Sequence, residues 1–159
     1  MRWLTVEAGT ARPARPPMPK PLSASARAKL VRAARRAAAA AYAPYSHFPV
    51  GAAVLAGSGR VFTGANVENA SFGLCTCAER AAICAAASAG ERRLAAVAVY
   101  TPTRAPTLPC GACRQLIQEF GPAALILAAC AGQAVLETRL SALLPAAFGP
   151  EDLGRPPAG

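Results

Sequence analysis

Three cysteines in two separate segments most constrain what this chain can fold into. Cys77 stands two residues before Glu79, and Cys110 and Cys113 form a C-x-x-C pair further along. Zinc in proteins is usually four-coordinate: structural sites fill all four positions with protein ligands, whereas catalytic sites use three and leave one for water. Three cysteines beside a carboxylate that is not a ligand therefore suit a hydrolytic zinc site.

The remaining cysteines leave the number of ligands open. Cys75 is the obvious candidate for a fourth ligand, which would make the site closed and structural. Cys84 would lie roughly 10 Å from Cys77 along a helix, too far to share one ion, and we expect both Cys84 and Cys130 to be core residues. From the cysteines alone, an open and a closed zinc site are equally expected. The presence of Glu79 favours the open site.

Size and composition predict a single folded domain in a reducing compartment. The chain has 159 residues, 53% of them hydrophobic, and only six cysteines, which is too few for a disulfide scaffold. Residues 1–6 are too short and soon turn too polar for a secretory signal, so we expect free thiols or metal ligands and a cytoplasmic location. Residues 37–59 carry no formal charge, but prolines and glycines interrupt them, so we expect no membrane span.

The formal charge of +9 is concentrated near the N-terminus. Residues 1–21 carry a net charge of +3 and residues 22–36 a net charge of +5, whereas the rest of the chain carries only +1. A basic tail and one basic helix are typical of a solvated surface rather than of a nucleic-acid footprint. We therefore expect no nucleic-acid partner.

Periodicity and turn residues predict one domain between two irregular ends. We expect residues 1–21, which are rich in proline and arginine, to be a disordered tail, residues 22–153 to be the domain and residues 154–159 to be a flexible C-terminus. Helices are expected at residues 23–41, 78–89, 112–120 and 138–144. Strands are expected at residues 48–56, 60–67, 94–100 and 123–129, the first two joined by a Gly-Ser-Gly hairpin turn.

The order of these elements predicts an α/β fold. Helices that alternate with apolar strands imply parallel strand pairing and helices packed on the faces of a sheet. Cys77 then stands where one helix starts, and Cys110 and Cys113 bracket the start of another. A helix N-terminus offers unpaired N–H groups and a positive dipole end, both of which favour the thiolate form that binds zinc.

Five collinear blocks of sequence match a known family. They are residues 45–53 (YSHFPVGAA), 66–71 (NVENAS), 77–80 (CAER), 109–115 (PCGACRQ) and 143–153, which contain LLP and FGPEDL. Together they resemble the zinc-dependent cytidine deaminases, specifically the small homotetrameric class with three cysteine ligands. The cysteine blocks also follow the signature of zinc nucleobase deaminases in its all-cysteine variant.

The resemblance implies a three-layer α-β-α sandwich with a five-stranded mixed sheet. It implies that Cys77, Cys110 and Cys113 hold one Zn²⁺ per subunit and that water takes the fourth position. It further implies hydrolytic deamination of cytidine and deoxycytidine, with release of ammonia, as a step of pyrimidine salvage. Glu79 would take the water proton, protonate N3 of the base and later protonate the departing amine.

Three polar residues flank the implied ligands: Arg80, Arg114 and Gln115. Three thiolates and one Zn²⁺ carry a net negative charge, which weakens the metal as a Lewis acid. Charge-assisted hydrogen bonds from the two guanidinium groups to the thiolates would restore some of that strength.

Five residues match the substrate site of the family: Phe48, Asn66, Glu68, Ala78 and Phe148. Asn66 and Glu68 would hold the ribose 3′-hydroxyl, because an amide and a carboxylate can share one hydroxyl as donor and acceptor. Phe48 would line the base pocket, and the backbone N–H of Ala78 would contact the pyrimidine. Phe148 would stack on the base in a neighbouring subunit of the tetramer.

Two positions depart from the family pattern. Phe72 stands where the family often has tyrosine, and Cys75 adds a thiol near the site. His47 is not at a ligand position, and we expect it to be exposed in a loop. The competing functions are deamination of another free base or nucleoside and a zinc-stapled nucleic-acid-binding module. Asn66 and Glu68 argue against the second, because a ribose clamp suits a free nucleoside.

Overall fold

The computed structural model describes residues 21–154. The irregular ends expected at residues 1–21 and 154–159 therefore lie almost entirely outside the described residues. Within residues 21–154, every helix is too short or too polar to cross a bilayer.

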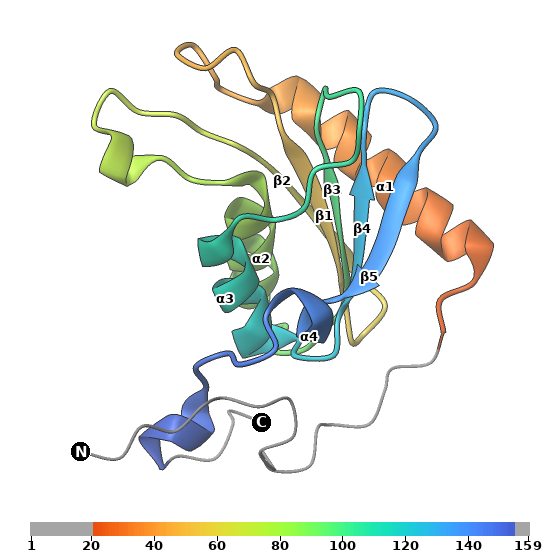
Figure 1. The fold of residues 1–159 in the computed structure, drawn as a ribbon, viewed down its shortest axis with the longest axis vertical. Helices are drawn as coiled ribbons and strands as arrows, with labels where there is room; N and C mark the ends of the chain where they lie inside the picture. The colour runs from red at the N-terminus through yellow and green to blue at the C-terminus, as the bar shows by residue number, and fades with distance from the viewer. Residues whose placement is uncertain (1–20, 155–159) are drawn as a thin grey trace.

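The centre of the fold is a five-stranded mixed sheet in the order β2-β1-β3-β4-β5 (Figure 1). Its strands are β1 Gly51–Ala56, β2 Val61–Ala65, β3 Leu94–Tyr100, β4 Leu125–Ala129 and β5 Val135–Arg139. β3 and β4 pair in parallel, as predicted for strands separated by a helix, and the other neighbours in this sheet pair antiparallel. The β1–β2 hairpin closes at the predicted turn, where the Gly59 N–H donates to Ala56.

Helices cover both faces of this sheet. They are α1 Ala24–Ala37, α2 Ala78–Ser88, α3 Gly111–Phe120 and the single turn α4 Leu140–Leu143, with 3₁₀ turns η1 Ala38–Ala40, η2 Phe72–Leu74 and η3 Pro150–Leu153. α1 packs Leu30 against one face, whereas α2 and α3 pack Ile83 and Ile117 against the other (Figure 1). The α-β-α layers expected for this chain are therefore confirmed.

One strand near the sheet edge begins later than expected, and one strand was not located. Strand β1 begins at Gly51 rather than at Phe48, because the Asn66 side chain takes the Phe48 carbonyl and the Val50 N–H out of the strand ladder. The helix expected at residues 138–144 is present as the shorter α4, and residues 138–139 instead end strand β5, which was not located in the sequence. β5 is an edge strand whose first three residues are exposed on both faces, so it has no hydrophobic alternation to signal it.

Of the two cysteines expected in the core, one prediction was right and one was wrong. Cys130 is fully buried. Cys84 is exposed, because α2 turns Ala82 and Ile83 toward the sheet and thereby places the next residue on its solvent side. An alanine-rich neighbourhood does not reveal which face of a helix is buried.

Helix α2 lies against β2 so closely that only glycine fits at position 64. A Cβ atom at Gly64 would overlap the backbone nitrogen of Ala82 and would lie 2.6 Å from the carbonyl oxygen of Ala78. Both contacts are backbone atoms, which cannot rotate away. Gly64 therefore sets where the first turn of α2 stands relative to the sheet.

Gly64→Ala is expected to destabilise the fold by about 1–3 kcal/mol, because α2 must shift away from β2 to admit the methyl group. Thermal denaturation should show a lower Tm. Gly73→Ala is the matched control, since no heavy atom lies within 4 Å of a Cβ built there, and its Tm should not change. Equal Tm values for the two variants would contradict the close approach.

Candidate metal centre and active site

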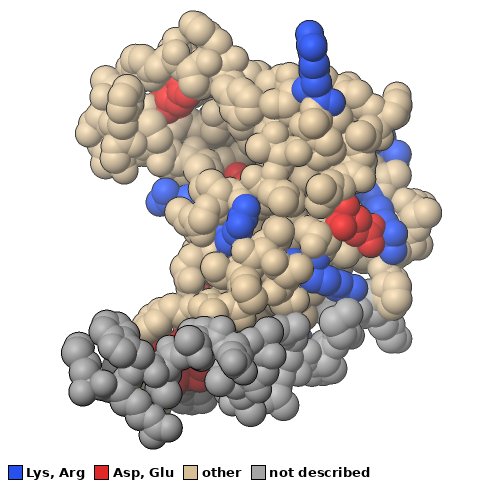
Figure 2. Space-filling model, in the orientation of Figure 1, with Lys and Arg blue, Asp and Glu red and all other residues tan. Residues whose placement is uncertain are grey.

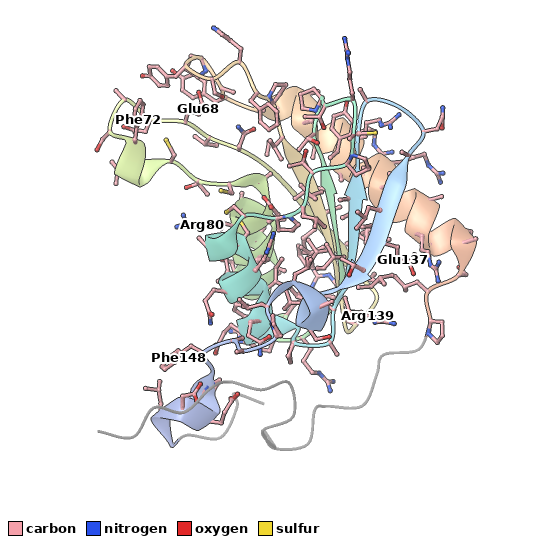
Figure 3. All side chains as sticks on the ribbon, viewed as in Figure 1. Glu68, Phe72, Arg80, Glu137, Arg139 and Phe148 are labelled. Atoms are coloured by element: carbon pink, nitrogen blue, oxygen red, sulfur yellow. The ribbon has the colours of Figure 1, made fainter. Side chains whose placement is uncertain are left out.

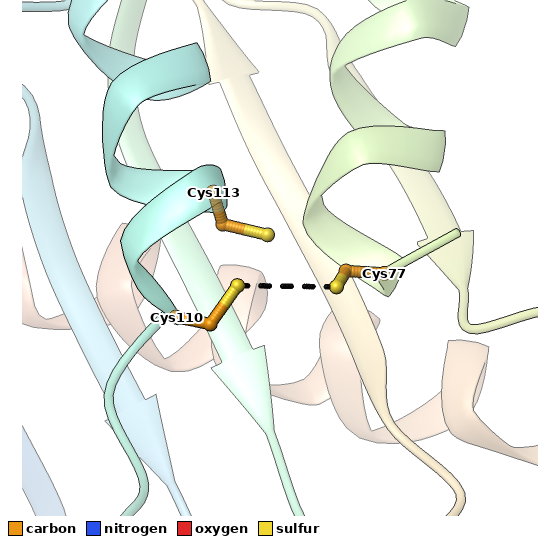
Figure 4. Close-up of side chains that lie close together, drawn as sticks. All are labelled: Cys77, Cys110 and Cys113. Carbon is orange, nitrogen blue, oxygen red and sulfur yellow. Dashed lines mark hydrogen bonds between the residues drawn. The ribbon is translucent and has the colours of Figure 1, made fainter. Parts of the chain in front are cut away.

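The N-termini of α2 and α3 lie side by side and carry the three cysteines (Figure 4). Cys77 is the N-cap residue of α2, Cys110 is the N-cap residue of α3, and Cys113 lies in the first turn of α3. The two segments that the sequence separates therefore meet in the fold. Both helix starts present unpaired N–H groups and a positive dipole end near the sulfur atoms, as predicted.

The spacing of the three sulfur atoms fits one metal ion. All three lie within 4.8 Å of one another, and the Sγ atoms of Cys77 and Cys110 are 4.0 Å apart. Tetrahedral zinc with Zn–S bonds of about 2.3 Å places its sulfur ligands roughly 3.8 Å apart. Among residues 21–154, this is the one group of His, Cys, Asp or Glu side chains close enough to share a metal. Thiolate donors at this spacing suit Zn²⁺.

Cys75 stays outside the sulfur group. Its Sγ accepts a hydrogen bond from the Asn69 N–H at 3.3 Å and donates to the Asn69 carbonyl at 3.6 Å. The group therefore has three protein donors. Three donors are the number found in catalytic zinc sites, where water takes the fourth position.

The thiols themselves favour a nearby cation. The pKa of Cys77 falls to about 6, chiefly because the Cys113 thiol donates a hydrogen bond to it, helped by Cys110 and by the positive charge of Arg80. The pKa of Cys113 is raised, mainly because it is the donor in that hydrogen bond and because it is buried. One thiolate is thus stable without a metal, but three adjacent thiolates require a strong positive charge among them.

Glu79 is a buried carboxyl group beside the sulfurs. It lies in the first turn of α2, is only 4% exposed, and lies beside the Cys113 thiol. Burial raises the pKa of Glu79, and the negative charge of Cys77 raises it further, although the Glu79 N–H and the Cys113 thiol oppose the shift. A carboxyl group with a raised pKa, close to the metal donors but not among them, is suited to move protons near neutral pH.

Residues 24–129 match the family model described as the cytidine and deoxycytidylate deaminase zinc-binding region. The chain belongs to this family. The family predicted from the five sequence blocks is therefore confirmed, and its zinc-binding character agrees with the three-sulfur group. The protein is a zinc-dependent deaminase-family enzyme with a site for one zinc ion in the chain.

Individual relatives agree over most of the chain. A cytidine deaminase of Mycobacterium tuberculosis is 49% identical over 122 residues, which are 77% of this chain and 89% of the relative. A cytidine deaminase of Halalkalibacterium halodurans is 47% identical over 129 residues, which are 80% of this chain and 97% of the relative. The crystal structure of cytidine deaminase from Burkholderia pseudomallei has a TM-score of 0.74 and 48% identity, and covers 76% of this chain and 98% of that chain.

In this deaminase-family site, the two arginines beside the ligands have different partners. Arg80 is exposed, and its charge lowers the pKa of Cys77 (Figure 3). Arg114 was expected to donate to a thiolate, but its guanidinium donates to the carbonyl oxygens of Pro109 at 2.7 Å and Leu143 at 3.2 Å. Pro109 is fully buried, so its carbonyl needs a donor. Arg114 therefore stabilises the turn that leads into α3 by hydrogen-bonding its backbone.

Gln115 and Phe148 form a further link between α3 and the C-terminal segment. The Gln115 side chain donates to the Phe148 carbonyl at 2.8 Å. The Phe148 ring is 57% exposed and lies well away from Glu68 and Arg80 of the same chain (Figure 3). The fold therefore fixes the backbone of Phe148 and leaves its ring outside the site formed by its own chain.

Ala78 lies at the start of α2, and Asn66 lies just after β2. Ala78 is the fully buried first residue of α2, so its N–H has no partner within the helix. Asn66 follows β2, and its side chain accepts from the Val50 N–H at 2.8 Å and donates to the Phe48 carbonyl at 3.0 Å. Asn66 thus holds the segment that carries Phe48, whose side chain is 37% exposed.

Glu68 holds the preceding part of the same loop. Its carboxylate accepts hydrogen bonds from the N–H groups of Tyr45 at 2.9 Å and Ser46 at 3.2 Å, and from the Ser46 hydroxyl. These hydrogen bonds, led by that of the Ser46 hydroxyl, lower the pKa of Glu68. His47 is exposed in this loop, as predicted, with a positive φ of 54°.

Sequence reasoning missed the loop contacts of Asn66 and Glu68 and gave no role to Ser46. A signal was present, because serine in a turn commonly hydrogen-bonds nearby backbone groups. The family blocks contained Ser46, but a linear match does not show that its partner is a carboxylate 22 residues away. Phe72, which stands where the family often has tyrosine, is 75% exposed, and its ring makes an edge contact with Tyr45.

Proposed function

We propose that this enzyme hydrolyses the exocyclic amine of cytidine and deoxycytidine, giving uridine or deoxyuridine and ammonia. The observation that carries the proposal is the group of three sulfur atoms at paired helix N-termini with the buried Glu79 against it. The relatives named above act as support, since the family blocks and the site coincide in this chain. We further propose that the reaction serves pyrimidine salvage in the cytoplasm.

Cys77, Cys110 and Cys113 would hold the zinc ion. When bound, zinc acts as a Lewis acid that lowers the pKa of water to about 7 and so makes hydroxide available at neutral pH. The Cys113 side chain is buried and the other two lie nearer the surface, so the protein shields one side of the site and leaves the other for water and substrate.

Glu79 would carry the protons of the reaction. It first accepts a proton from the attacking water and delivers it to N3 as the oxygen bonds to C4 of the base. The remaining hydroxyl proton then passes through Glu79 to the amine, the C4–N4 bond breaks, and ammonia leaves as the C4 carbonyl forms. The raised pKa of Glu79, caused chiefly by its burial, makes its carboxylate a stronger acceptor for the water proton than an exposed glutamate would be.

The residues around Phe48 would hold the nucleoside. Asn66 and Glu68 would share one ribose hydroxyl, Phe48 would pack against the base, and the N–H of Ala78 would contact its polar edge. Each lies on a segment that the fold fixes: α2 through Gly64 and the loop through Asn66. Arg80 would offset part of the negative charge of the thiolates.

On the face of the described residues that Figure 2 shows, the blue side chains form no long basic track for a polynucleotide. They lie apart from one another or beside a red side chain. On α1, Arg27 pairs with Glu137 at 2.9 Å, and Arg35 donates to the carbonyls of Cys130 and Gly132. These contacts favour a free nucleoside over a nucleic-acid strand as the substrate.

The assay that tests this function follows the ultraviolet absorbance of cytidine and deoxycytidine with the zinc-loaded enzyme, together with release of ammonia. Turnover of either nucleoside supports the proposal. Turnover of free cytosine or another base in preference to both nucleosides would replace it with the alternative deaminase. Absence of ammonia release from every substrate would remove it.

We also propose a homotetramer in which Phe148 of each subunit stacks on the base in a neighbouring site. Phe148→Ala should raise KM for cytidine by about tenfold, because an aromatic contact with a base contributes about 1–3 kcal/mol. Light scattering should show four chains per particle. Phe120→Ala is not a suitable comparison because Phe120 packs in the core. Leu153→Ala is the suitable control, because Leu153 is 62% exposed on the same C-terminal segment. This variant should leave KM for cytidine unchanged.

Co-expression of the Phe148→Ala chain with the Glu79→Gln chain gives a stricter test of a site shared between subunits. A mixed tetramer would contain sites with Glu79 from one variant and Phe148 from the other. These sites should turn over cytidine with the wild-type KM. If mixing restores nothing, Phe148 does not act in a neighbouring subunit.

A further inference from the structure

Residues 43–50 form a loop, here called the substrate loop, in which Glu68 holds Tyr45 and Ser46 and Asn66 holds residues 48–50. Ser46 connects these two parts. Its hydroxyl donates to the Glu68 carboxylate and accepts the Phe48 N–H at 3.1 Å. The loop bends sharply here, with His47 at positive φ and its N–H bonded to the Ala43 carbonyl at 3.1 Å. One hydroxyl group therefore fixes both the orientation of Glu68 and the backbone of Phe48.

The hydrogen-bonding capacity of Glu68 is almost filled by these contacts. A carboxylate has about four acceptor positions. The N–H groups of Tyr45 and Ser46 occupy two positions on Oε2, and the Ser46 hydroxyl occupies one on Oε1. One acceptor position on Oε1 remains for a ligand.

Asn66 is similarly restricted. The Val50 N–H takes one lone pair of its carbonyl oxygen, and the Phe48 carbonyl takes one of its two N–H donors. One N–H donor and one lone pair of the carbonyl oxygen remain for a ligand. The free acceptor position of Glu68 and the free N–H of Asn66 can therefore share a single hydroxyl group.

The charge of Glu68 fixes the direction of the first of these bonds. Hydrogen bonds to the carboxylate keep its pKa low, so it is ionised at neutral pH and can only accept. A ligand hydroxyl must therefore donate to Glu68 and accept from Asn66. Without the Ser46 hydroxyl, Oε1 would have two free acceptor positions, and the carboxylate would lose the contact that sets its rotation.

We infer that Ser46 is a positioning residue for nucleoside binding: it leaves Glu68 with one acceptor aimed at one ribose hydroxyl and holds Phe48 for the base. The inference rests on the proposed nucleoside substrate. Ser46 acts through Glu68 and Phe48 and is not part of the sulfur group where the bond to nitrogen breaks. Its removal should therefore affect KM and leave kcat unchanged.

The test compares cytidine with 2′,3′-dideoxycytidine, which lacks the 2′- and 3′-hydroxyl groups of the ribose. Ser46→Ala should raise KM for cytidine about tenfold, as expected for losing the orientation of a hydrogen bond to a charged group. For the dideoxy nucleoside, the rise should be much smaller, because there is no hydroxyl for Glu68 to accept from. Ser46→Thr keeps the hydroxyl and should restore the wild-type KM for cytidine.

The chain offers a matched control in Ser58. Its hydroxyl donates to Glu91 at 2.5 Å and accepts the N–H of Arg60, two residues on, at 3.3 Å. The arrangement is the same as at Ser46, but it lies in the β1–β2 turn, at the opposite end of β1 from the substrate loop. Ser58→Ala should leave KM for both nucleosides unchanged.

The outcomes separate this inference from the proposed function. If the wild-type enzyme does not turn over cytidine, the proposed function fails. If it does, but Ser46→Ala raises KM equally for cytidine and the dideoxy nucleoside, Ser46 only supports the loop and the inference is wrong. An unchanged KM for cytidine, or a loss confined to kcat, overturns it as well. Zinc content equal to that of wild type shows that the metal site of the variant is intact.

Discussion

Glu79→Gln is expected to lower kcat for cytidine by about 10²- to 10⁴-fold, the usual contribution of a positioned proton-transfer group. Glutamine has nearly the same shape but cannot take a proton from water or return one to the amine. Cys77, Cys110 and Cys113 are unchanged in this variant, so zinc content should stay at that of wild type. The predicted result is an inactive protein that is fully loaded with metal.

The stability of this variant gives a second readout. Burial raises the pKa of Glu79, which means that the fold disfavours its charged form. A neutral glutamine removes this penalty, so the Tm of metal-free Glu79→Gln should not fall below that of metal-free wild type. Loss of activity with an unchanged or higher Tm separates a catalytic role from a structural one.

Glu119→Gln is the matched control, because Glu119 is an exposed carboxylate on α3, whereas Glu79 is a buried one on α2. Ultraviolet assays should give wild-type kcat for this variant, and elemental analysis should give wild-type zinc. If Glu79→Gln kept a kcat within about tenfold of wild type, a range too small for general acid–base catalysis, Glu79 would have to be removed from the mechanism.

The metal site could be predicted well because its positions depend on local signals. Cys77, Cys110 and Cys113 stand at helix starts. An alanine run favours α2, and glycine or Gly-Pro follows the two helices. Strand β3 Leu94–Tyr100 was predicted to the residue because it is an unbroken apolar run between polar segments. Features that depend on the burial and turn preferences of neighbouring residues can therefore be predicted from the sequence.

Features that depend on a distant partner could not be predicted in the same way. Nothing near Arg114 indicates that it meets the Leu143 carbonyl rather than a thiolate. Strand β5 is stabilised by backbone pairing with β4, which leaves no pattern in its own side chains. Asn66 was expected within the strand at residues 60–67 and instead follows β2, and its bonds to the Phe48 segment arise from the tertiary fold.

Cys113→Ala is expected to remove both zinc and activity. Cys113 is the buried member of the sulfur group, and alanine leaves two protein donors, one fewer than catalytic zinc sites use. Zinc affinity should fall by more than the roughly 10- to 100-fold that outer hydrogen-bonding partners contribute. Elemental analysis and the cytidine assay measure the two losses directly.

Thermal denaturation with and without a chelator tests whether zinc also stabilises the fold. A ligand that binds only the folded state raises the Tm, so chelation should lower the Tm of wild type. The Tm of Cys113→Ala should already be low and should not respond to the chelator. A chelator-sensitive Tm in this variant would mean that the metal is held elsewhere.

Two further cysteines supply the controls that decide between an open and a closed site. Cys84→Ala changes an exposed thiol on α2 and should keep wild-type zinc and activity. Cys75→Ser changes the thiol that bonds to Asn69 outside the sulfur group, and it should also keep one zinc ion per chain. If Cys75→Ser lost zinc as Cys113→Ala does, four thiolates would close the site, and no position for the attacking water would remain.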